Sequence, residues 1–153
     1  MSSDGTPEYV AISRLQQRYA DIVSRRAWAE MPDVFEADCV IELDLRDRAL
    51  RFTGGPAIAE FIAGAVARFD FFVFAVLNTV VDHLDGPMGR ASGRVYTCEL
   101  RHDPASGEFS QAFGLYRDFY HRSPEGWRFA NRRYASLGRF DGRSFSGFAF
   151  PAG

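Results

Sequence analysis

An α+β domain is the fold class that the sequence predicts. Three observations support it: apolar residues recur at helical spacing in the first half of the chain, strand-like runs follow one another in the second half, and short turns separate those runs. Helices followed by consecutive strands are typical of α+β domains, in which the helices pack on one face of the sheet. A chain of 153 residues has the size of one hydrophobic core, so we expect a single domain over residues 1–153.

Three helical segments are expected before the sheet. The first begins near residues 6–7, where threonine caps the helix and proline fits its first turn. Its apolar positions recur at helical spacing; they are Ile12, Leu15, Tyr19, Ile22 and Val23. Residues 34–35 indicate a short second helix before a strand at 39–43. The turn 54–56 starts the third helix, whose apolar face extends to Phe69.

Four strand-like runs make up the second half of the chain: 71–84, 90–102, 108–122 and 126–137. They are apolar or alternate between apolar and polar residues, and turn residues such as aspartate, glycine and proline separate them. Strands joined by turns this short pair antiparallel with their neighbours. The sequence therefore predicts an antiparallel meander.

Several of these strands are apolar on both faces. In the run 108–122, Phe113 lies on one side and Tyr116 on the other. Because the helices cover only one face of such a sheet, we expect a second subunit on the other face and predict a homodimer. The tail 138–153 is rich in phenylalanine and glycine, and we expect it to fold over the domain or over a partner, since exposed aromatic residues are unfavourable in water.

The composition excludes several classes of function. All 18 basic residues are arginine, and without lysine the chain cannot act as a Schiff-base aldolase, a pyridoxal-phosphate enzyme or a P-loop nucleotidase. The formal net charge of −2 gives no electrostatic footprint for nucleic acid, so no such partner is expected and a neutral small molecule fits better. Cys39 and Cys98 are too few for a disulfide framework and are expected to be buried.

Neither a membrane span nor a metal centre is expected. The most apolar stretch, 61–81, is interrupted by Arg68 and Asp70, which would be costly inside a bilayer. Residues 1–5 lack the basic and apolar parts of a signal peptide, so a cytoplasmic location is expected. The histidines do not stand at the spacing of metal ligands; they are His83, His102 and His121.

A series of short motifs runs through residues 10–137: Tyr19-Ala20-Asp21, Arg26-Ala27-Trp28, the run 35–41, Gly54-Gly55-Pro56-Ala57-Ile58, Leu77-Asn78-Thr79-Val80-Val81, Tyr116-Arg117-Asp118, Gly126-Trp127-Arg128-Phe129 and Arg132-Arg133. Their order resembles the nuclear transport factor 2-like superfamily and, more narrowly, its SnoaL-like group, which includes scytalone dehydratase and bacterial bile-acid dehydratases. The resemblance implies a cone-shaped fold, in which N-terminal helices pack on a curved antiparallel sheet and enclose a pocket. It also implies proton transfer without a cofactor on hydrophobic, often polycyclic, molecules.

The catalytic residues of the dehydratases in this group do not carry over. By ungapped alignment, the positions of their aspartate and two histidines fall at Ser24, Phe74 and Glu99, and two further polar pocket positions fall at Gly114 and Tyr116. The His-Asp dyad is therefore absent, because phenylalanine cannot transfer a proton and serine cannot hold an imidazole by charge.

The ketosteroid isomerase branch of the superfamily matches only in part. Its tyrosine, a donor to the developing enolate, matches Tyr19, whereas the position of its aspartate base falls at Leu43. The neighbouring Asp44 points to the other face of the strand, because successive strand residues alternate in direction.

Glu99 is the principal catalytic candidate. It shares a strand face with Arg101, and a carboxylate that faces an apolar pocket has a raised pKa, which suits acid or base catalysis near pH 7. Tyr116 and Tyr19 are the candidate hydrogen-bond donors to an oxyanion. The alternative is that Glu99 is compensated by an arginine, namely Arg101, Arg117 or Arg133.

Six further residues are expected to contact the substrate: Ser24, Phe74, Asn78, Gly114, Asp118 and Trp127. Three of them have structural alternatives. Asp118 would pair with Arg133 near the mouth of the pocket, Asn78 would satisfy backbone groups at a bend, and Trp127 would anchor the core.

Three functions are compatible with these residues. The first is an isomerase, dehydratase or cyclase that needs no cofactor and acts on a hydrophobic polyketide-, steroid- or aromatic-like molecule. The second is a relative that binds such a ligand without turning it over. The third is a partner subunit similar to the small β subunits of aromatic-ring dioxygenases.

Overall fold

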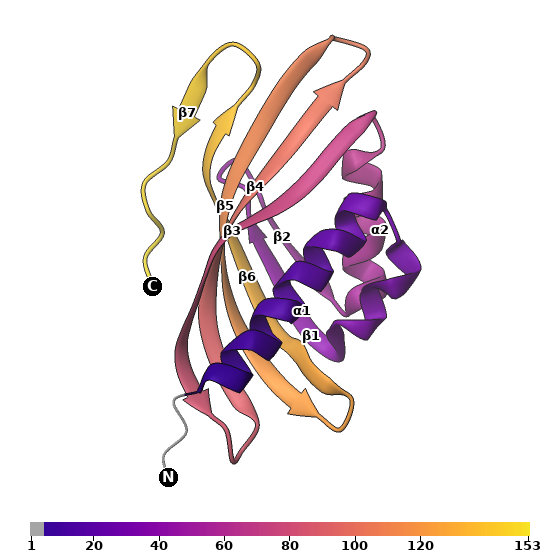
Figure 1. The fold of residues 1–153 in the computed structure, drawn as a ribbon. Coiled ribbons are helices and arrows are strands. Elements are labelled where there is room, and N and C mark those ends of the chain that lie inside the picture. The colour runs from indigo at the N-terminus through magenta and orange to yellow at the C-terminus, as the bar shows by residue number, and fades with distance from the viewer. Residues whose placement is uncertain (1–4) are drawn as a thin grey trace.

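Two α-helices and one 3-10 helix pack against a seven-stranded sheet in the computed structural model, which describes residues 5–153 (Figure 1). The elements are α1 (Thr6–Arg25), η1 (Trp28–Asp33), β1 (Phe35–Asp44), β2 (Ala49–Thr53), α2 (Gly55–Val66), β3 (Phe71–Asp85), β4 (Arg90–Asp103), β5 (Glu108–Ser123), β6 (Gly126–Phe140) and β7 (Phe145–Gly147). The predicted α+β class is confirmed. The signal-peptide expectation rests mainly on residues 1–4, which lie outside the described part of the chain.

Strands β3 to β6 form the predicted meander, each antiparallel to the next. The full order is β2-β1-β6-β5-β4-β3. β1 runs parallel to β6, with Ile41 opposite Arg132, so the sheet is mixed and departs here from the expected antiparallel pairing. Most of the domain lies between β1 and β6 in the sequence. A connection of this length permits parallel pairing, which a hairpin does not.

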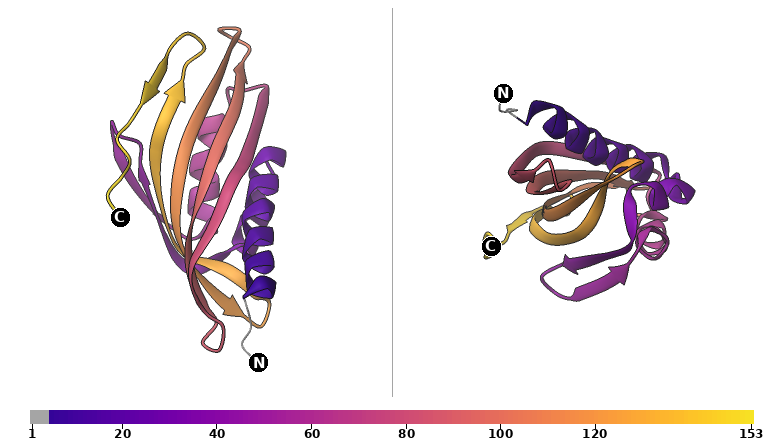
Figure 2. Two further views of the ribbon diagram at one scale, coloured as in Figure 1. Left: turned by 60° about the vertical axis from the view of Figure 1, so that its left-hand side comes forward. Right: turned by 90° about the horizontal axis from the view of Figure 1, so that it is seen from below.

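The helices cover one face of the curved sheet (Figure 2). α1 packs mainly on β3, and α2 packs on η1 and β1. Between them and the sheet lies a core whose most fully buried side chains include Ile12, Ile22, Met31 and Phe129. This arrangement leaves the concave side of the sheet enclosed, as expected for a cone.

Several boundaries in the first half differ from the prediction. Gly5, not Thr6, precedes the first turn of α1. The short helix spans 28–33, and Phe35 already begins β1, because the paired strand extends further toward the N-terminus than its apolar run suggests. The sequence did not predict β2, because this strand has only five residues and none of them is buried. Phe69 lies beyond the end of α2 but is buried.

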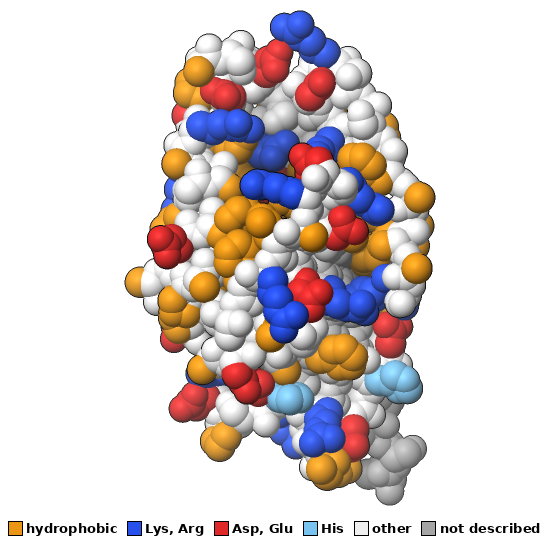
Figure 3. Space-filling view, turned by 180° about the vertical axis from the view of Figure 1, so that it is seen from behind, with side chains coloured by type: hydrophobic (Ala, Val, Ile, Leu, Met, Phe, Trp, Pro, Cys, Tyr) orange, Lys and Arg blue, Asp and Glu red, His pale blue; other side chains and the backbone are white. Residues whose placement is uncertain are grey.

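The C-terminal tail folds against its own domain. β7 pairs antiparallel with the end of β6, and Arg117 on the outer face donates to the carbonyl oxygens of Pro151 at 3.1 Å and Ala152 at 2.6 Å. On this side of the molecule hydrophobic and arginine side chains lie next to one another (Figure 3). Phe119 on this face is 54% exposed. The homodimer contact expected on this face stays a prediction. None of the helices in residues 5–153 is both long and apolar enough to cross a membrane.

Candidate functional site

A cavity of about 380 Å³ lies between the sheet, α2 and the C-terminal half of α1. Its wall is largely apolar and aromatic, and includes Phe61, Phe69, Phe72 and Phe74. The polar lining comprises Tyr19, Thr97, Glu99, Tyr116, Tyr134 and Ser136, together with Asp47 and the arginines Arg48, Arg68, Arg101, Arg132 and Arg139. Small-molecule sites usually combine apolar and aromatic walls with convergent polar groups, and this cavity has both.

Glu99 lies in the wall of this cavity. β4 places it opposite Phe74 of β3 and Ala112 of β5. Burial raises the pKa of the Glu99 carboxyl, and the charges of Arg101 and Arg139 oppose that shift only in part. Arg101 Nη1 lies 4.0 Å from Glu99 Oε2, which is too far for a hydrogen bond. The carboxylate is therefore near a cation but is not fixed by one.

The other two arginines considered as partners of Glu99 lie elsewhere. Arg117 and Arg133 line a depression on the outer face of the sheet, near the tail, and Arg117 is bonded to tail carbonyl oxygens. Of the three, Arg101 alone shares the cavity with Glu99.

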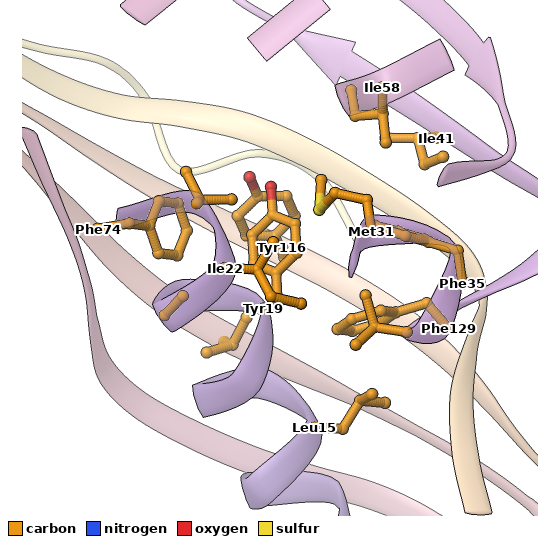
Figure 4. Close-up of a cluster of buried hydrophobic side chains, with 14 of the residues drawn as sticks. Leu15, Tyr19, Ile22, Met31, Phe35, Ile41, Ile58, Phe74, Tyr116 and Phe129 are labelled. Carbon is orange, nitrogen blue, oxygen red and sulfur yellow. The ribbon is translucent and has the colours of Figure 1, made fainter. Parts of the chain in front are cut away.

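Two phenol groups meet inside the cavity. Tyr19 of α1 and Tyr116 of β5 are buried, their ring centroids are 6.3 Å apart, and each phenol influences the pKa of the other. Figure 4 shows both hydroxyls at the same end of the two rings. Burial raises the pKa of both groups, so both stay protonated at neutral pH. A protonated phenol can donate its hydroxyl proton to a ligand.

Gly114 leaves room for a third phenol, that of Tyr134, in the cavity wall. A Cβ atom at Gly114 would overlap the ring of Tyr134, which passes over this position with its centroid 4.8 Å from that of Tyr116. Tyr134 lines the cavity, whereas Gly114 does not. Sequence reasoning missed Tyr134, although it lies two residues from Arg132 and from Ser136 and therefore shares their strand face.

Beyond the phenols, a buried set of polar groups closes the inner end of the cavity. Arg132 Nε donates to Asp118 Oδ1 at 2.8 Å, and its Nη2 donates to Asp118 Oδ2 at 3.2 Å. Gln16 Nε2 donates to Asp118 Oδ2 at 2.7 Å, while Gln16 Oε1 accepts from Arg132 Nη2 at 3.0 Å. The Tyr120 hydroxyl donates to Asp118 Oδ2 at 3.2 Å. We call Gln16, Asp118, Tyr120 and Arg132 the floor cluster.

The guanidinium of Arg132 is enclosed by rings as well as by polar partners. It lies 3.7 Å from the ring centroid of Tyr116, 4.0 Å from that of Phe129 and 4.6 Å from that of Tyr19. Asp118 itself does not line the cavity. Its partner is Arg132 and not the predicted Arg133, because Arg132 is the residue in register with Asp118 and its neighbour points to the opposite face.

Ser24, Asn78 and Trp127 do not reach the cavity. The Ser24 hydroxyl accepts a 2.9 Å hydrogen bond from the backbone N–H of Phe74 and so fastens α1 to β3. Asn78 is exposed at a bulge of β3, in a depression between β3 and α1. Trp127 is buried near the start of β6, at the opposite end of the strand from the cavity opening. Of the predicted substrate contacts, the structure brings Phe74 directly to the cavity.

Four arginines surround the cavity opening, and three of them were missed by sequence reasoning. Arg48 lies in the β1–β2 turn, Arg68 between α2 and β3, Arg101 near the end of β4 and Arg139 near the end of β6. Because β4 and β6 run in the same direction and β3 starts where they end, these segments meet at the upper end in Figure 1. We call Arg48, Arg68, Arg101 and Arg139 the mouth arginines.

The histidines lie apart from this site. His102 Nδ1 is 2.6 Å from Asp70 Oδ1, and His121 Nδ1 is 3.1 Å from Glu36 Oε1. Within residues 5–153, no group of three or more histidine, cysteine or acidic side chains is arranged to hold a metal ion.

Comparison with known proteins agrees with this architecture. The SnoaL-like domain family matches residues 6–133. A solved structure described as that of a candidate scytalone dehydratase from Novosphingobium aromaticivorans superposes with a TM-score of 0.76 at 18% identity, covering 92% of this chain and 91% of that one. A hexachlorocyclohexane dehydrochlorinase from Novosphingobium barchaimii gives a TM-score of 0.72 at 14% identity, with coverage of 94% and 91%.

A third similar structure is described as the β subunit of a candidate aromatic-ring-hydroxylating dioxygenase, also from Novosphingobium aromaticivorans. It gives a TM-score of 0.72 at 15% identity and covers 88% of this chain and 92% of that one. No protein of curated function matches the sequence significantly. At these identities the similarities concern the fold.

Proposed function

Because this chain belongs to the SnoaL-like domain family, we propose that its cavity performs acid–base isomerisation, dehydration or cyclisation on a hydrophobic polyketide-, steroid- or aromatic-like molecule. The observation that carries the proposal is the position of Glu99, a carboxylate with a raised pKa in an aromatic cavity that the phenols of Tyr19 and Tyr116 also line. A raised pKa makes the carboxylate a stronger base for proton transfer.

In the proposed step, Glu99 removes a proton from a carbon next to a substrate carbonyl. The C–H bond breaks, the proton moves to a Glu99 oxygen, and the electron pair forms the C=C bond of an enolate whose oxygen takes the negative charge. The hydroxyl of Tyr19 or Tyr116 donates a hydrogen bond to that oxygen. Return of the proton to another carbon of a conjugated enolate gives isomerisation. In dehydration the enolate electron pair expels a β-hydroxyl group, the C–O bond breaks, and the proton held by Glu99 moves to the leaving oxygen, which departs as water.

The step is tested by hydrogen–deuterium exchange into 2-tetralone, a bicyclic ketone with acidic hydrogens, followed by mass spectrometry in D₂O. We expect the protein to accelerate exchange over buffer and Glu99→Gln to lose roughly 10²-fold or more of that acceleration. Glu125→Gln, which removes an exposed carboxylate paired with Arg128, is the matched control and should keep it. Acceleration that survives in Glu99→Gln would exclude Glu99 as the base.

A binding protein without turnover is the second candidate. One observation favours it: at the positions aligned with the dehydratase dyad stand Phe74 and Ser24, and the Ser24 hydroxyl is bonded to the backbone of Phe74. In that case wild type and Glu99→Gln would bind a hydrophobic ligand equally well, and neither would accelerate exchange. A dioxygenase β-subunit role, suggested by one similar structure, predicts instead co-purification with a larger iron protein.

A further inference from the structure

The charge at the cavity opening differs in sign from the charge of the whole chain. The formal net charge is −2, yet the cavity lining holds five arginines against Asp47 and Glu99. Arg132 is already neutralised by Asp118 in the floor cluster. The four mouth arginines therefore face two carboxylates, of which Glu99 has a raised pKa because it is buried.

The protein itself uses few of the N–H groups of the mouth arginines. Arg101 donates from Nε to Ser110 Oγ at 3.2 Å, and its Nη1 is 4.0 Å from Glu99. Arg139 uses one terminal nitrogen, Nη2, for Leu45 O and Ser136 Oγ. A guanidinium has five N–H donors, so both side chains keep donors that the fold does not consume.

The two outer arginines are still less engaged. Arg68 Nε lies 3.9 Å from Asp103 Oδ2, and the Arg68 side chain is 69% exposed. Arg48 forms no side-chain hydrogen bond or ion pair within residues 5–153, and it is exposed. Arg68 and Arg101 both lie over the ring of Phe69, at 4.7 and 5.3 Å from its centroid, which holds the two cations over an apolar wall.

From this arrangement we propose that the ligand of the cavity is an amphiphilic carboxylate: an aromatic or alicyclic body among the phenylalanines, and a carboxylate at the mouth arginines, held chiefly by Arg101 and Arg139. A planar carboxylate matches the guanidinium fork and can take two parallel hydrogen bonds from it. This inference rests on the proposed function in one respect, since it names the substrate class of the same cavity.

The orientation of the ligand follows from the two ends of the cavity. The carboxylate end stays at the half-exposed opening, where the arginines are, and the apolar body points inward toward Tyr19, Tyr116 and Phe74. The reacting carbon then lies between the two ends, beside Glu99 on β4, which is two residues from Arg101 on the same strand face. Placing an anion on Arg101 and Arg139 also occupies the two cations nearest the Glu99 carboxylate.

Binding alone tests the proposal, with 2-naphthoate and its neutral analogue 2-naphthamide as probes in isothermal titration calorimetry. We expect wild type to bind the carboxylate about tenfold or more tightly than the amide, as befits a charge-assisted bidentate contact. The ratio should fall toward one in Arg101→Gln and in Arg139→Gln. It should be unchanged in Arg128→Gln, which removes the same charge near the far end of β6.

Equal affinities for the two probes in wild type would overturn the proposal, and so would a preference for the carboxylate that persists in both mouth variants. Absence of binding by both probes would also overturn it. Arg139 additionally bonds Leu45, so Arg101→Gln is the decisive variant if Arg139→Gln is unstable. Because no turnover is measured, this experiment can succeed when the exchange experiment fails, and the reverse.

Discussion

The two ends of the cavity both depend on arginine, but they use it in opposite ways. In the floor cluster, Arg132 is 1% exposed and makes two short bonds to one carboxylate. At the opening, Arg101 and Arg68 approach carboxylates only to 4.0 and 3.9 Å. The residue type is the same, and what differs is the counter-ion: Arg132 is paired with Asp118, although its Nη1 has no hydrogen-bond partner within residues 5–153, whereas Arg101 and Arg68 have no carboxylate within hydrogen-bond distance.

This difference separates a structural role from a binding role. A buried guanidinium paired with an internal carboxylate has its charge neutralised by the fold. A half-exposed guanidinium with unused donors costs the fold little and is available to a ligand. Whether an arginine already has an internal counter-ion is therefore a better guide to function in this chain than the presence of a charge.

The largest expected effect comes from breaking the floor cluster. Asp118→Ala leaves the charge of Arg132 buried without its counter-ion, and we expect a loss of about 3 to 5 kcal/mol in the free energy of unfolding, measured by urea denaturation. Arg101→Gln at the opening should cost less than about 1 kcal/mol in the same assay. Comparable losses in the two variants would contradict the division between floor and mouth.

A smaller loss of stability is expected at Gly114, where the backbone and the Tyr134 ring are in close contact between the floor cluster and the opening. Gly114→Ala places a methyl group in the space of the Tyr134 ring, and overpacking of this kind costs about 1 to 3 kcal/mol. Thermal unfolding followed by circular dichroism provides the measurement. Gly64→Ala is the matched control, because a Cβ there meets nothing within 4 Å and alanine suits the α2 helix better than glycine.

The smallest effect concerns Glu99 and depends on pH. Burial raises its pKa in the folded protein, so the folded state binds a proton more tightly than the unfolded chain does. This contribution to stability is present below the ordinary glutamate pKa and is lost as the pH rises through the raised value. Glu99→Gln should therefore gain stability relative to wild type as the pH rises from 4 to 7, by less than about 1 kcal/mol because the Glu99 side chain is still 28% exposed to solvent.

Urea titrations of both proteins across that pH range supply the test. Removing a carboxylate thus has opposite consequences at the two ends: loss at Asp118 and slight gain at Glu99. A destabilised Glu99→Gln at pH 7 would show that Arg101 and Arg139 hold Glu99 as firmly as Arg132 holds Asp118.

Local pattern predicted much of the fold but not the whole sheet. Turn residues mark the ends of β3 to β6, and alternation of apolar residues marks their faces, so the meander could be read directly. The parallel pairing of β1 with β6 leaves no local signal, because its partners are far apart in the chain. β2 is too short and too exposed to stand out from a loop.

The site could be predicted only where one strand carries the signal. Glu99 and Arg101 share a face by simple alternation, and both line the cavity. Arg132 and Arg133 are neighbours of the same type, and choosing between them as partner of Asp118 needs the register of β5 against β6, which bulges shift twice. Arg48, Arg68 and Arg139 stand at unrelated positions in the sequence, and only the topology brings them to one opening.

The pairing of β1 with β6 also sets the order in which the protein can fold. β1 emerges early from the ribosome, whereas β6, which pairs with one of its edges, is synthesised only after β5. Contacts between such distant segments slow folding, because the chain must close a long loop before they stabilise it. We expect the meander to form first and the β1–β2 hairpin to dock on it last, so that the cavity exists only once the final step is complete.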